Sequence, residues 1–249
     1  MNYLTGDIGN TSTKVSILDY KFVIKKSYIV KTKSLYKKKN VNKFFKVFLN
    51  KNLNKKVLFS SVVPNIYKMV KGYLKDKHFQ ALEIKDLNIK KILKVNIKNF
   101  EQLGSDRIAN AIGANKNRNC LIIDFGTATT FDIVINKVYE GGVIAPGVNL
   151  SIINLNKFTS QLPLLNLSNR QKNYGKNTKE ALNAGFLWGY EGLVNNIINK
   201  ITNISKKKYK IILTGGYAKL FKKVIKNKSV IDQNITIKGI AKIFKGLLI

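Results

Sequence analysis

The sequence has very little cysteine or histidine: one Cys120 and one His78 among 249 residues. A single cysteine excludes an internal disulfide and is typical of a reducing compartment. One residue of each type also excludes a zinc site built from cysteine and histidine, because such a site needs three or four of them. No stretch approaches the roughly 18 uninterrupted apolar residues of a transmembrane helix, and the first ten residues do not resemble a secretory signal. We therefore expect a cytoplasmic protein with no membrane partner.

Acidic residues and arginine are scarce as well. Thirteen Asp and Glu face 45 Lys and Arg, for a formal charge of +32, and three of those 45 are arginine. Such a charge predicts attraction to polyanions, so a nucleic-acid-binding protein is one alternative. DNA readers commonly use arginine for bidentate base contacts, however, and the abundant Lys, Asn and Ile share A/T-rich codons. We favour a compositional origin of the charge and expect no specific nucleic-acid partner, which a filter-binding titration at two salt concentrations would test.

What remains is a chain with 45% hydrophobic residues, enough for a buried core. Each half opens with a strand, a polar turn containing glycine and two more strands, and then continues into helices. This order indicates a duplicated α/β unit with its seam near residues 114–119, and hence two domains, 1–117 and 118–249. The expected strands are 2–7, 14–19, 22–31, 57–62, 120–124, 130–135, 138–144 and 209–214, and the expected helices are 40–51, 64–76, 106–117, 147–156, 178–203, 216–226 and 238–248.

The two glycine turns have the same layout. DIGNTSTK (7–14) and DFGTATT (124–130) each place an aspartate at the end of a strand, ahead of glycine and hydroxyl residues. Glycine lets backbone N–H groups approach a ligand, and successive N–H groups hold phosphate. A carboxylate beside phosphate implies a cation between them, and Mg²⁺ takes one or two carboxylates with phosphate oxygens and water. One copy would suit an ordinary hairpin turn, but two copies favour a site for nucleotide phosphates and metal.

Six segments of the sequence, in this order, resemble the type III pantothenate kinases over almost the whole chain. They are DIGNTSTK (7–14), LGSDRIANAIGA (103–114), IIDFGTATTFDIV (122–134), GGVIAPGV (141–148), GKNTKEALNAG (175–185) and LTGGYA (213–218). The resemblance implies the acetate and sugar kinase/Hsp70/actin fold, with two ribonuclease-H-like domains around a nucleotide cleft. It implies ATP-dependent phosphorylation of pantothenate to 4'-phosphopantothenate, the first step of coenzyme A biosynthesis. It also implies a homodimer that needs Mg²⁺ and a monovalent cation, K⁺ or NH₄⁺.

The resemblance also implies roles for individual residues. Asp106 would accept the proton of the substrate hydroxyl, Asp124 would bind the monovalent cation, and Asp7 would lie near Mg²⁺. The implied pantothenate-binding residues are Gly104, Ser105, Asp106, Arg107 and Thr178. The implied ATP-binding residues are Asp7, Ile8, Gly9, Asn10, Thr11, Ser12, Thr13, Lys14 and Thr127.

Two positions depart from the family pattern. Ile97 stands where the family usually has a tyrosine, and Phe100 where it usually has a proline. We therefore expect weaker or altered substrate binding. Taken alone, GSDR (104–107) is also typical of a helix start capped by Ser105 or Asp106. A regulatory relative of the same fold, which binds nucleotide without transferring phosphate, is the other alternative.

Overall fold

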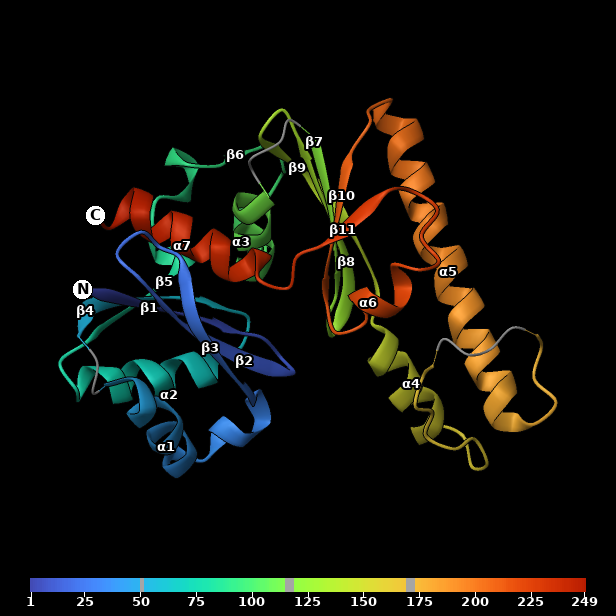
Figure 1. Ribbon diagram of the computed structural model, residues 1–249, viewed down its shortest axis with the longest axis horizontal. Helices are drawn as coiled ribbons and strands as arrows, with labels where there is room; N and C mark the ends of the chain where they lie inside the picture. Colours follow the sequence, from blue (N-terminus) through green and yellow to red (C-terminus); the bar gives the residue numbers. More distant parts are fainter. Residues whose placement is uncertain (50–51, 115–118, 169–172) are drawn as a thin grey trace. The chain divides into compact units, whose positions relative to one another are not determined.

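The structure is a computed structural model that describes residues 1–49, 52–114, 119–168 and 173–249. Its elements form two mixed β-sheets flanked by helices (Figure 1). The chain divides into two compact units, each built around one sheet. The first unit holds the described residues up to 114, together with Lys137–Glu140 and Asn234–Ile249. The second unit holds the described residues 119–136 and Gly141–Gln233.

The sheet of the first unit has five strands. They are β1 (Asn2–Ile8), β2 (Ser12–Leu18), β3 (Ile24–Lys31), β4 (Leu53–Ser61) and β5 (Gln80–Glu83). Their order is β3-β2-β1-β4-β5. The first three strands are joined by antiparallel hairpins, whereas β4 is parallel to β1 and β5 is parallel to β4.

The second sheet repeats this order. Its strands are β7 (Asn119–Phe125), β8 (Ala128–Ile135), β9 (Val138–Pro146), β10 (Lys210–Gly215) and β11 (Ser229–Ile231), with β6 (Lys94–Val95) paired to the start of β9. The order β9-β8-β7-β10-β11 matches that of the first sheet strand for strand. β7 is again antiparallel to the next strand and parallel to the fourth. The predicted duplicated α/β fold is therefore confirmed.

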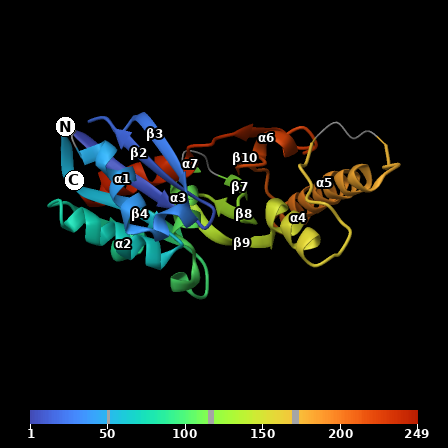
Figure 2. The ribbon, with the colours of Figure 1, turned by 90° about the horizontal axis from the view of Figure 1, so that it is seen from below.

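Amphipathic helices cover one face of each sheet, as their apolar spacing predicts. In the first unit these are α1 (Lys38–Leu49) and α2 (Pro64–Lys75), which lie on the same face (Figures 1 and 2). Phe45 of α1 and Val70 of α2 pack on Ile8 and Val15 in one buried cluster. In the second unit α4 (Val148–Lys157), α5 (Thr178–Ser205) and α6 (Ala218–Phe221) pack on β7 and β10.

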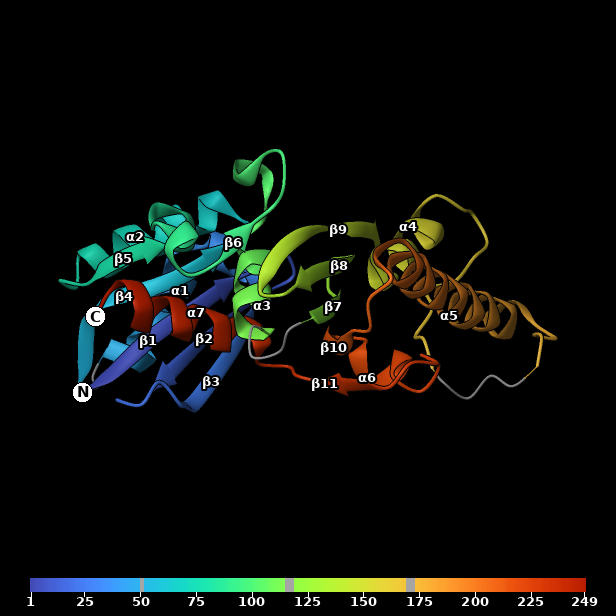
Figure 3. The same ribbon diagram turned by 90° about the horizontal axis from the view of Figure 1, so that it is seen from above.

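The last helix, α7 (Ile235–Leu247), belongs to the first unit although it is last in the chain. It packs against α3 (Ser105–Ala114), as Figures 1 and 3 both show. Glycine allows this close approach: a Cβ on Gly239 would lie 1.8 Å from the carbonyl oxygen of Ala109. The Thr236 hydroxyl donates to Asn110 Oδ1 at 2.7 Å. The compact units therefore differ from a division at 117/118, because the final helix packs with the N-terminal half.

Gly239→Ala is expected to destabilise the protein by ~1–3 kcal/mol or more, because the new methyl group would overlap backbone that cannot move aside. The matched control is Gly72→Ala in α2, where nothing lies within 4 Å of the new Cβ. That change should stabilise by ~0.5–1 kcal/mol through helix propensity. Urea titrations of both variants measure the difference, and equal midpoints would contradict the tight α3–α7 contact.

Most expected elements are present within a few residues of their predicted ends, but three short strands were missed and one helix was predicted wrongly. A helix was expected over 216–226, but the observed helix, α6, spans only Ala218–Phe221. The segment that follows is held instead by Asn195 of α5, whose amide donates to Val224 O at 3.0 Å and accepts from Lys226 N at 3.0 Å. Residues 50–51 and 115–117 of two expected helices, and most of the 114–119 seam, lie outside the described residues. The described ranges also contain the 3₁₀ turns η1 (Thr32–Tyr36), η2 (Ile84–Asp86), η3 (Ile89–Lys91) and η4 (Phe100–Gln102).

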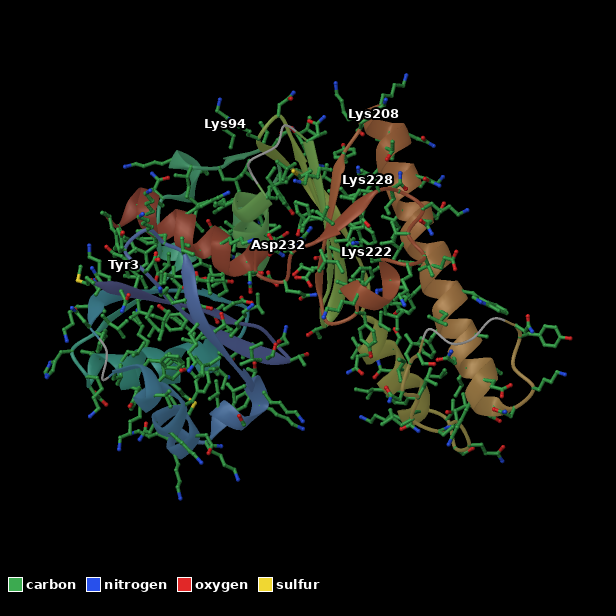
Figure 4. The ribbon with its side chains drawn as sticks, in the orientation of Figure 1. Tyr3, Lys94, Lys208, Lys222, Lys228 and Asp232 are labelled. Atoms are coloured by element: carbon green, nitrogen blue, oxygen red, sulfur yellow. The ribbon has the colours of Figure 1, made fainter. Side chains whose placement is uncertain are left out.

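The positive charge lies on solvated side chains. Lys94, Lys208 and Lys222 are exposed, and Figure 4 shows Lys94 and Lys208 extending away from the ribbon. Solvated lysines of this kind need no anionic partner for stability. That the protein has no specific nucleic-acid partner stays a prediction. Across the described ranges, none of the helices combines the length and hydropathy that a membrane span requires.

Candidate active site

The turn between β1 and β2 is open to solvent at its tip. Asn10, Thr11 and Ser12 are exposed, and the chain reverses through a hydrogen bond from Gly9 N to Ser12 O of 3.1 Å. Asp7 lies just before the turn, opposite Lys14 on β2 and Ser60 on β4. The structure therefore gathers one carboxylate and a short run of donors at one end of the first sheet.

Thr32, which the sequence did not indicate, braces this turn from η1. Its buried hydroxyl donates to Gly9 O at 2.6 Å, and its backbone N–H donates to Thr11 O at 3.0 Å. Because that proton is used on Gly9, the Thr13 hydroxyl donates to Thr32 Oγ1 at 3.0 Å. The side chains of Ile8 and Thr13 are both buried, so these two residues can offer a ligand only their backbone. Lys14 Nζ donates to Asn234 Oδ1 within the same unit.

Asp124 repeats the placement of Asp7 in the second sheet. It is the sixth residue of β7, as Asp7 is of β1, and it lies between Thr130 on β8 and Thr214 on β10. Its carboxylate rests in a cradle of two glycines: a Cβ on Gly215 would lie 2.5 Å from Oδ1, and one on Gly126 would lie 3.4 Å from it. Gly215 also has φ +84°, a conformation that favours glycine.

Thr127 lies in the β7–β8 turn, against the start of α4. A Cβ on Gly147 would lie 1.8 Å from Thr127 O, so glycine is needed for this approach. The buried Thr129 hydroxyl donates to Pro146 O at 3.0 Å and joins the same two segments. The second unit thus brings together three of the sequence motifs: the DFGTATT turn, the end of β9 and the turn after β10.

The GSDR segment forms the entrance to α3. Asp106 Oδ1 turns back to accept from Arg107 N at 2.8 Å. Glycine makes room for it, since a Cβ on Gly104 would lie 2.5 Å from the same oxygen. Burial raises the pKa of Asp106, and the Arg107 N–H and the charges of Arg107 and Lys85 oppose that rise. Asp106 is both a helix-start residue and a carboxylate more basic than usual.

The end of β4 connects the β1–β2 turn to the GSDR segment within the first unit. Ser61 pairs with Ile8, and Val62 N donates to Ile8 O at 3.1 Å. On the other side, Val62 Cγ1 lies 3.7 Å from the position that a Cβ on Gly104 would take. Two motifs about a hundred residues apart in the sequence therefore flank one strand end.

Thr178 lies elsewhere, at the first position of α5 in the second unit. Asn177 caps this helix by accepting from Glu180 N at 3.0 Å. The exposed Thr178 lines a cavity of about 600 Å³ between α4 and α5. Other residues that line this cavity are Pro146, Ser151, Leu155, Phe186 and Tyr190.

The model of a known family, described as type III pantothenate kinase, matches residues 3–200 of this chain. The chain belongs to the type III pantothenate kinase family. It is 45% identical over 240 residues to the type III pantothenate kinase of Pelagibacter ubique (strain HTCC1062), covering 95% of this chain and 96% of that protein. It is 36% identical over 253 residues to that of Ehrlichia canis (strain Jake), covering 94% and 92%.

Solved structures share the fold at low sequence identity. A protein described as a Baf family transcriptional activator from Campylobacter jejuni matches with a TM-score of 0.63 and 20% identity, covering 97% of each chain. Lmo2764 from Listeria monocytogenes, described as an N-acetylmannosamine kinase, matches with a TM-score of 0.56 and 12% identity, covering 98% of this chain and 99% of that one. At such identities these likenesses concern the fold alone, which is that of the actin-like ATPases and sugar kinases.

The two departures from the family pattern lie on the segment that leads into GSDR. Phe100 begins η4, and Asn99 caps that turn by accepting from Glu101 N at 3.1 Å. Leu103 N donates back to Phe100 O at 3.0 Å. The segment is therefore ordered without a proline at position 100, and both Ile97 and Phe100 are half-buried. Their effect on substrate binding stays a prediction.

The carboxylates present suit the ions that the family implies. Among the described residues no three His, Cys, Asp or Glu side chains gather as a metal cluster would. Mg²⁺ that completes its shell with phosphate and water needs only one or two protein carboxylates, so Asp7 fits this mode. Because Gly126 and Gly215 carry no Cβ, neither side chain crowds the Asp124 carboxylate, and carboxylate oxygens are suitable ligands for a hard cation.

Proposed function

We propose that this protein transfers the γ-phosphoryl group of ATP to pantothenate and forms 4'-phosphopantothenate, the first step of coenzyme A biosynthesis. Membership of a family of kinases over most of the chain supports this activity. The structural observation that carries it lies in the first unit. There an open glycine turn beside Asp7 and a half-buried carboxylate of raised pKa at Asp106 flank the same end of β4.

Asp106 is the proton acceptor in this proposal. The pantothenate hydroxyl attacks the γ-phosphorus, a new O–P bond forms, the bond to the β-phosphate oxygen breaks and ADP leaves. The hydroxyl proton passes to Asp106, which must be ionised to take it. A raised pKa suits this role, because a general base works best when its pKa approaches the working pH. Gly104, Ser105 and Arg107 bind pantothenate, Ser105 through its backbone because its side chain is 1% exposed, and the planar guanidinium of Arg107 is suited to a carboxylate.

The residues from Asp7 to Lys14 bind the phosphates of ATP through the N–H groups and hydroxyls of their exposed turn. Thr127 of the second unit contacts ATP, and Thr178 contacts the substrate. Mg²⁺ would neutralise phosphate charge, and Asp7 would hold it. Asp124 would hold K⁺ or NH₄⁺ in its glycine cradle.

We further propose that the enzyme is a cytoplasmic homodimer. The face formed by α4 and α5 carries exposed apolar side chains, including Phe158 at 76% and Trp188 at 45% exposure. Exposed apolar side chains of this kind are typical of an interface. Sedimentation equilibrium should give twice the mass of one chain, and a monomer at micromolar concentration would contradict this part of the proposal.

The function is tested by ADP release from purified protein with Mg-ATP, with and without pantothenate, in K⁺, NH₄⁺ or Na⁺ alone. We expect turnover that needs both pantothenate and K⁺ or NH₄⁺. If pantothenate-dependent turnover is equally fast in Na⁺, the kinase activity is supported and the proposed role of Asp124 in binding K⁺ or NH₄⁺ is rejected. Folded protein that binds ATP without turnover would instead favour the regulatory alternative.

A further inference from the structure

Glu83, at the end of β5, is an acidic residue that the site described above does not use. Its half-buried carboxylate accepts from two backbone N–H groups, Ser61 N at 3.2 Å through Oε1 and Lys85 N at 2.7 Å through Oε2. Its own backbone N–H donates to Asp86 Oδ2 at 3.1 Å, which completes a capping box around η2. The carboxylate is therefore held at the end of β4, where the β1–β2 turn and the GSDR segment meet.

The Ser105 hydroxyl lies beside this carboxylate. It is 1% exposed, and it lowers the pKa of Glu83 as a hydrogen-bond donor does, against the stronger rise that burial causes. The contact falls short of full hydrogen-bond geometry, and no other partner of that hydroxyl exists in the described part of the chain. A buried hydroxyl that forms no hydrogen bond lowers the stability of the fold, and the Glu83 carboxylate is the acceptor that lies near it.

Two backbone N–H groups thus donate to one carboxyl group, and the Ser105 hydroxyl lies close to it. An ionised carboxylate suits them because it only accepts, whereas a glutamine amide would turn an NH₂ group toward one of the donors. Lys85, in the same turn, reaches the segment before GSDR, where its Nζ donates to Glu101 O at 2.7 Å. The corner between β5 and η2 therefore lies close to Ser105, the first residue of α3, and contacts Glu101 in the segment that precedes GSDR.

We propose that Glu83 is a positioning residue for phosphoryl transfer: through Ser105 it fixes the first turn of α3, and with it the placement of Asp106 and Arg107. Ser105 is the first residue of α3, and the other two follow it directly. This role rests on the proposed function of Asp106 and Arg107. Small misplacements of reacting groups cost up to about 10²-fold in rate, so a residue outside the site can matter as much as one within it.

The test compares Glu83→Gln and Ser105→Ala, singly and together, with Asp86→Asn as the control. Asp86 lies in the same turn and completes the same capping box, but within the described ranges it forms no hydrogen bond with Ser61 or Ser105. Glu83→Gln should lower kcat/KM for pantothenate by ~10–100-fold and leave KM for ATP within about twofold. Asp86→Asn should keep both parameters. A role in stability alone would lower the melting temperature and the active fraction without separating the two substrates.

The double variant decides whether the two residues act as a pair. If Glu83 acts through Ser105, adding Ser105→Ala to Glu83→Gln should change kcat/KM by less than about twofold. Effects that multiply, an equal loss toward both substrates, or a normal kcat/KM in Glu83→Gln would overturn the proposal. If Glu83→Gln does not fold, Ser105→Ala decides alone, and normal kcat/KM for pantothenate in that variant would overturn it.

A readout that does not depend on turnover separates this inference from the proposed function. Amide hydrogen exchange at Asp106 and Arg107 should be faster in Glu83→Gln than in the wild type and unchanged in Asp86→Asn. Exchange that is equally slow in all three proteins would contradict the positioning role. If the wild type lacks pantothenate turnover, faster exchange in Glu83→Gln would retain Glu83 as the anchor of α3 and reject only the kinase function.

Discussion

Asp106→Asn is expected to lower kcat by about 10²–10⁴-fold, the range that general-base groups contribute, while the protein becomes more stable. The loss follows because an amide cannot accept the hydroxyl proton. The shape of the side chain is kept, so the amide oxygen of the variant can still accept from Arg107 N, as Asp106 Oδ1 does at 2.8 Å. Steady-state ADP release and a thermal melt of the same preparation measure both effects. Full activity in this variant would reject Asp106 as the acceptor.

The gain in stability follows from the sign of the pKa shift. Burial raises the pKa of Asp106 in the folded protein, so the folded state binds that proton more tightly than the unfolded chain. The contribution of this group to stability is complete below the unfolded pKa and is lost as the pH rises through the folded value. At neutral pH the ionised, half-buried carboxylate therefore destabilises the fold, and asparagine removes that cost. Each ~1 kcal/mol recovered should raise the melting temperature by about 2–4 °C.

The same shift predicts the acid limb of the pH–rate profile. Activity should fall as the pH drops through the pKa of Asp106, and that midpoint should lie above the range of an ordinary aspartate. A midpoint at the ordinary value would contradict the effect of burial. Asp86→Asn serves as the control for the loss of an acidic side chain nearby.

Gly215→Ala is expected to remove most of the activity and to destabilise the protein, while Gly216→Ala does neither. At Gly215 a Cβ would lie 2.5 Å from both Asp124 Oδ1 and Phe125 C, and the φ of +84° is strained for alanine. At Gly216, one residue further, nothing lies within 4 Å of the new Cβ. The strain and the overlap each cost ~1–3 kcal/mol.

The measurement for this pair is kcat as a function of K⁺ concentration, together with a urea titration. Gly215→Ala should need more K⁺ for half-maximal activity, because its methyl group displaces the carboxylate that would hold the ion. If Gly215→Ala is destabilised but its K⁺ dependence is unchanged, the contact between Gly215 and Asp124 does not contribute to cation binding. A large effect of Gly216→Ala would show that the turn after β10 is sensitive for another reason.

The sequence by itself determined the features that depend on neighbouring residues. Strand and helix periodicity marked most elements, and the repeated Asp–x–Gly layout of Asp7 and Asp124 indicated a duplicated unit. The two matching strand orders confirm that duplication. The helix start at GSDR was also predicted to within one residue, although neither Ser105 nor Asp106 caps it in the expected way: both lie inside the helix, and Asp106 Oδ1 accepts from the adjacent Arg107 N. The resemblance to the kinases rested on the same short segments.

Only the tertiary structure decided which distant segments support those motifs. Thr32, at the start of η1, supports the β1–β2 turn by donating to Gly9 O. Glu83 lies close to Ser105, which is more than twenty residues further along the chain. Asn195 holds the segment after α6, and α7 returns to pack on α3. Each of these contacts joins segments that lie far apart in the sequence. The spacing of neighbouring residues does not predict these contacts, because they depend on how the helices and strands pack together.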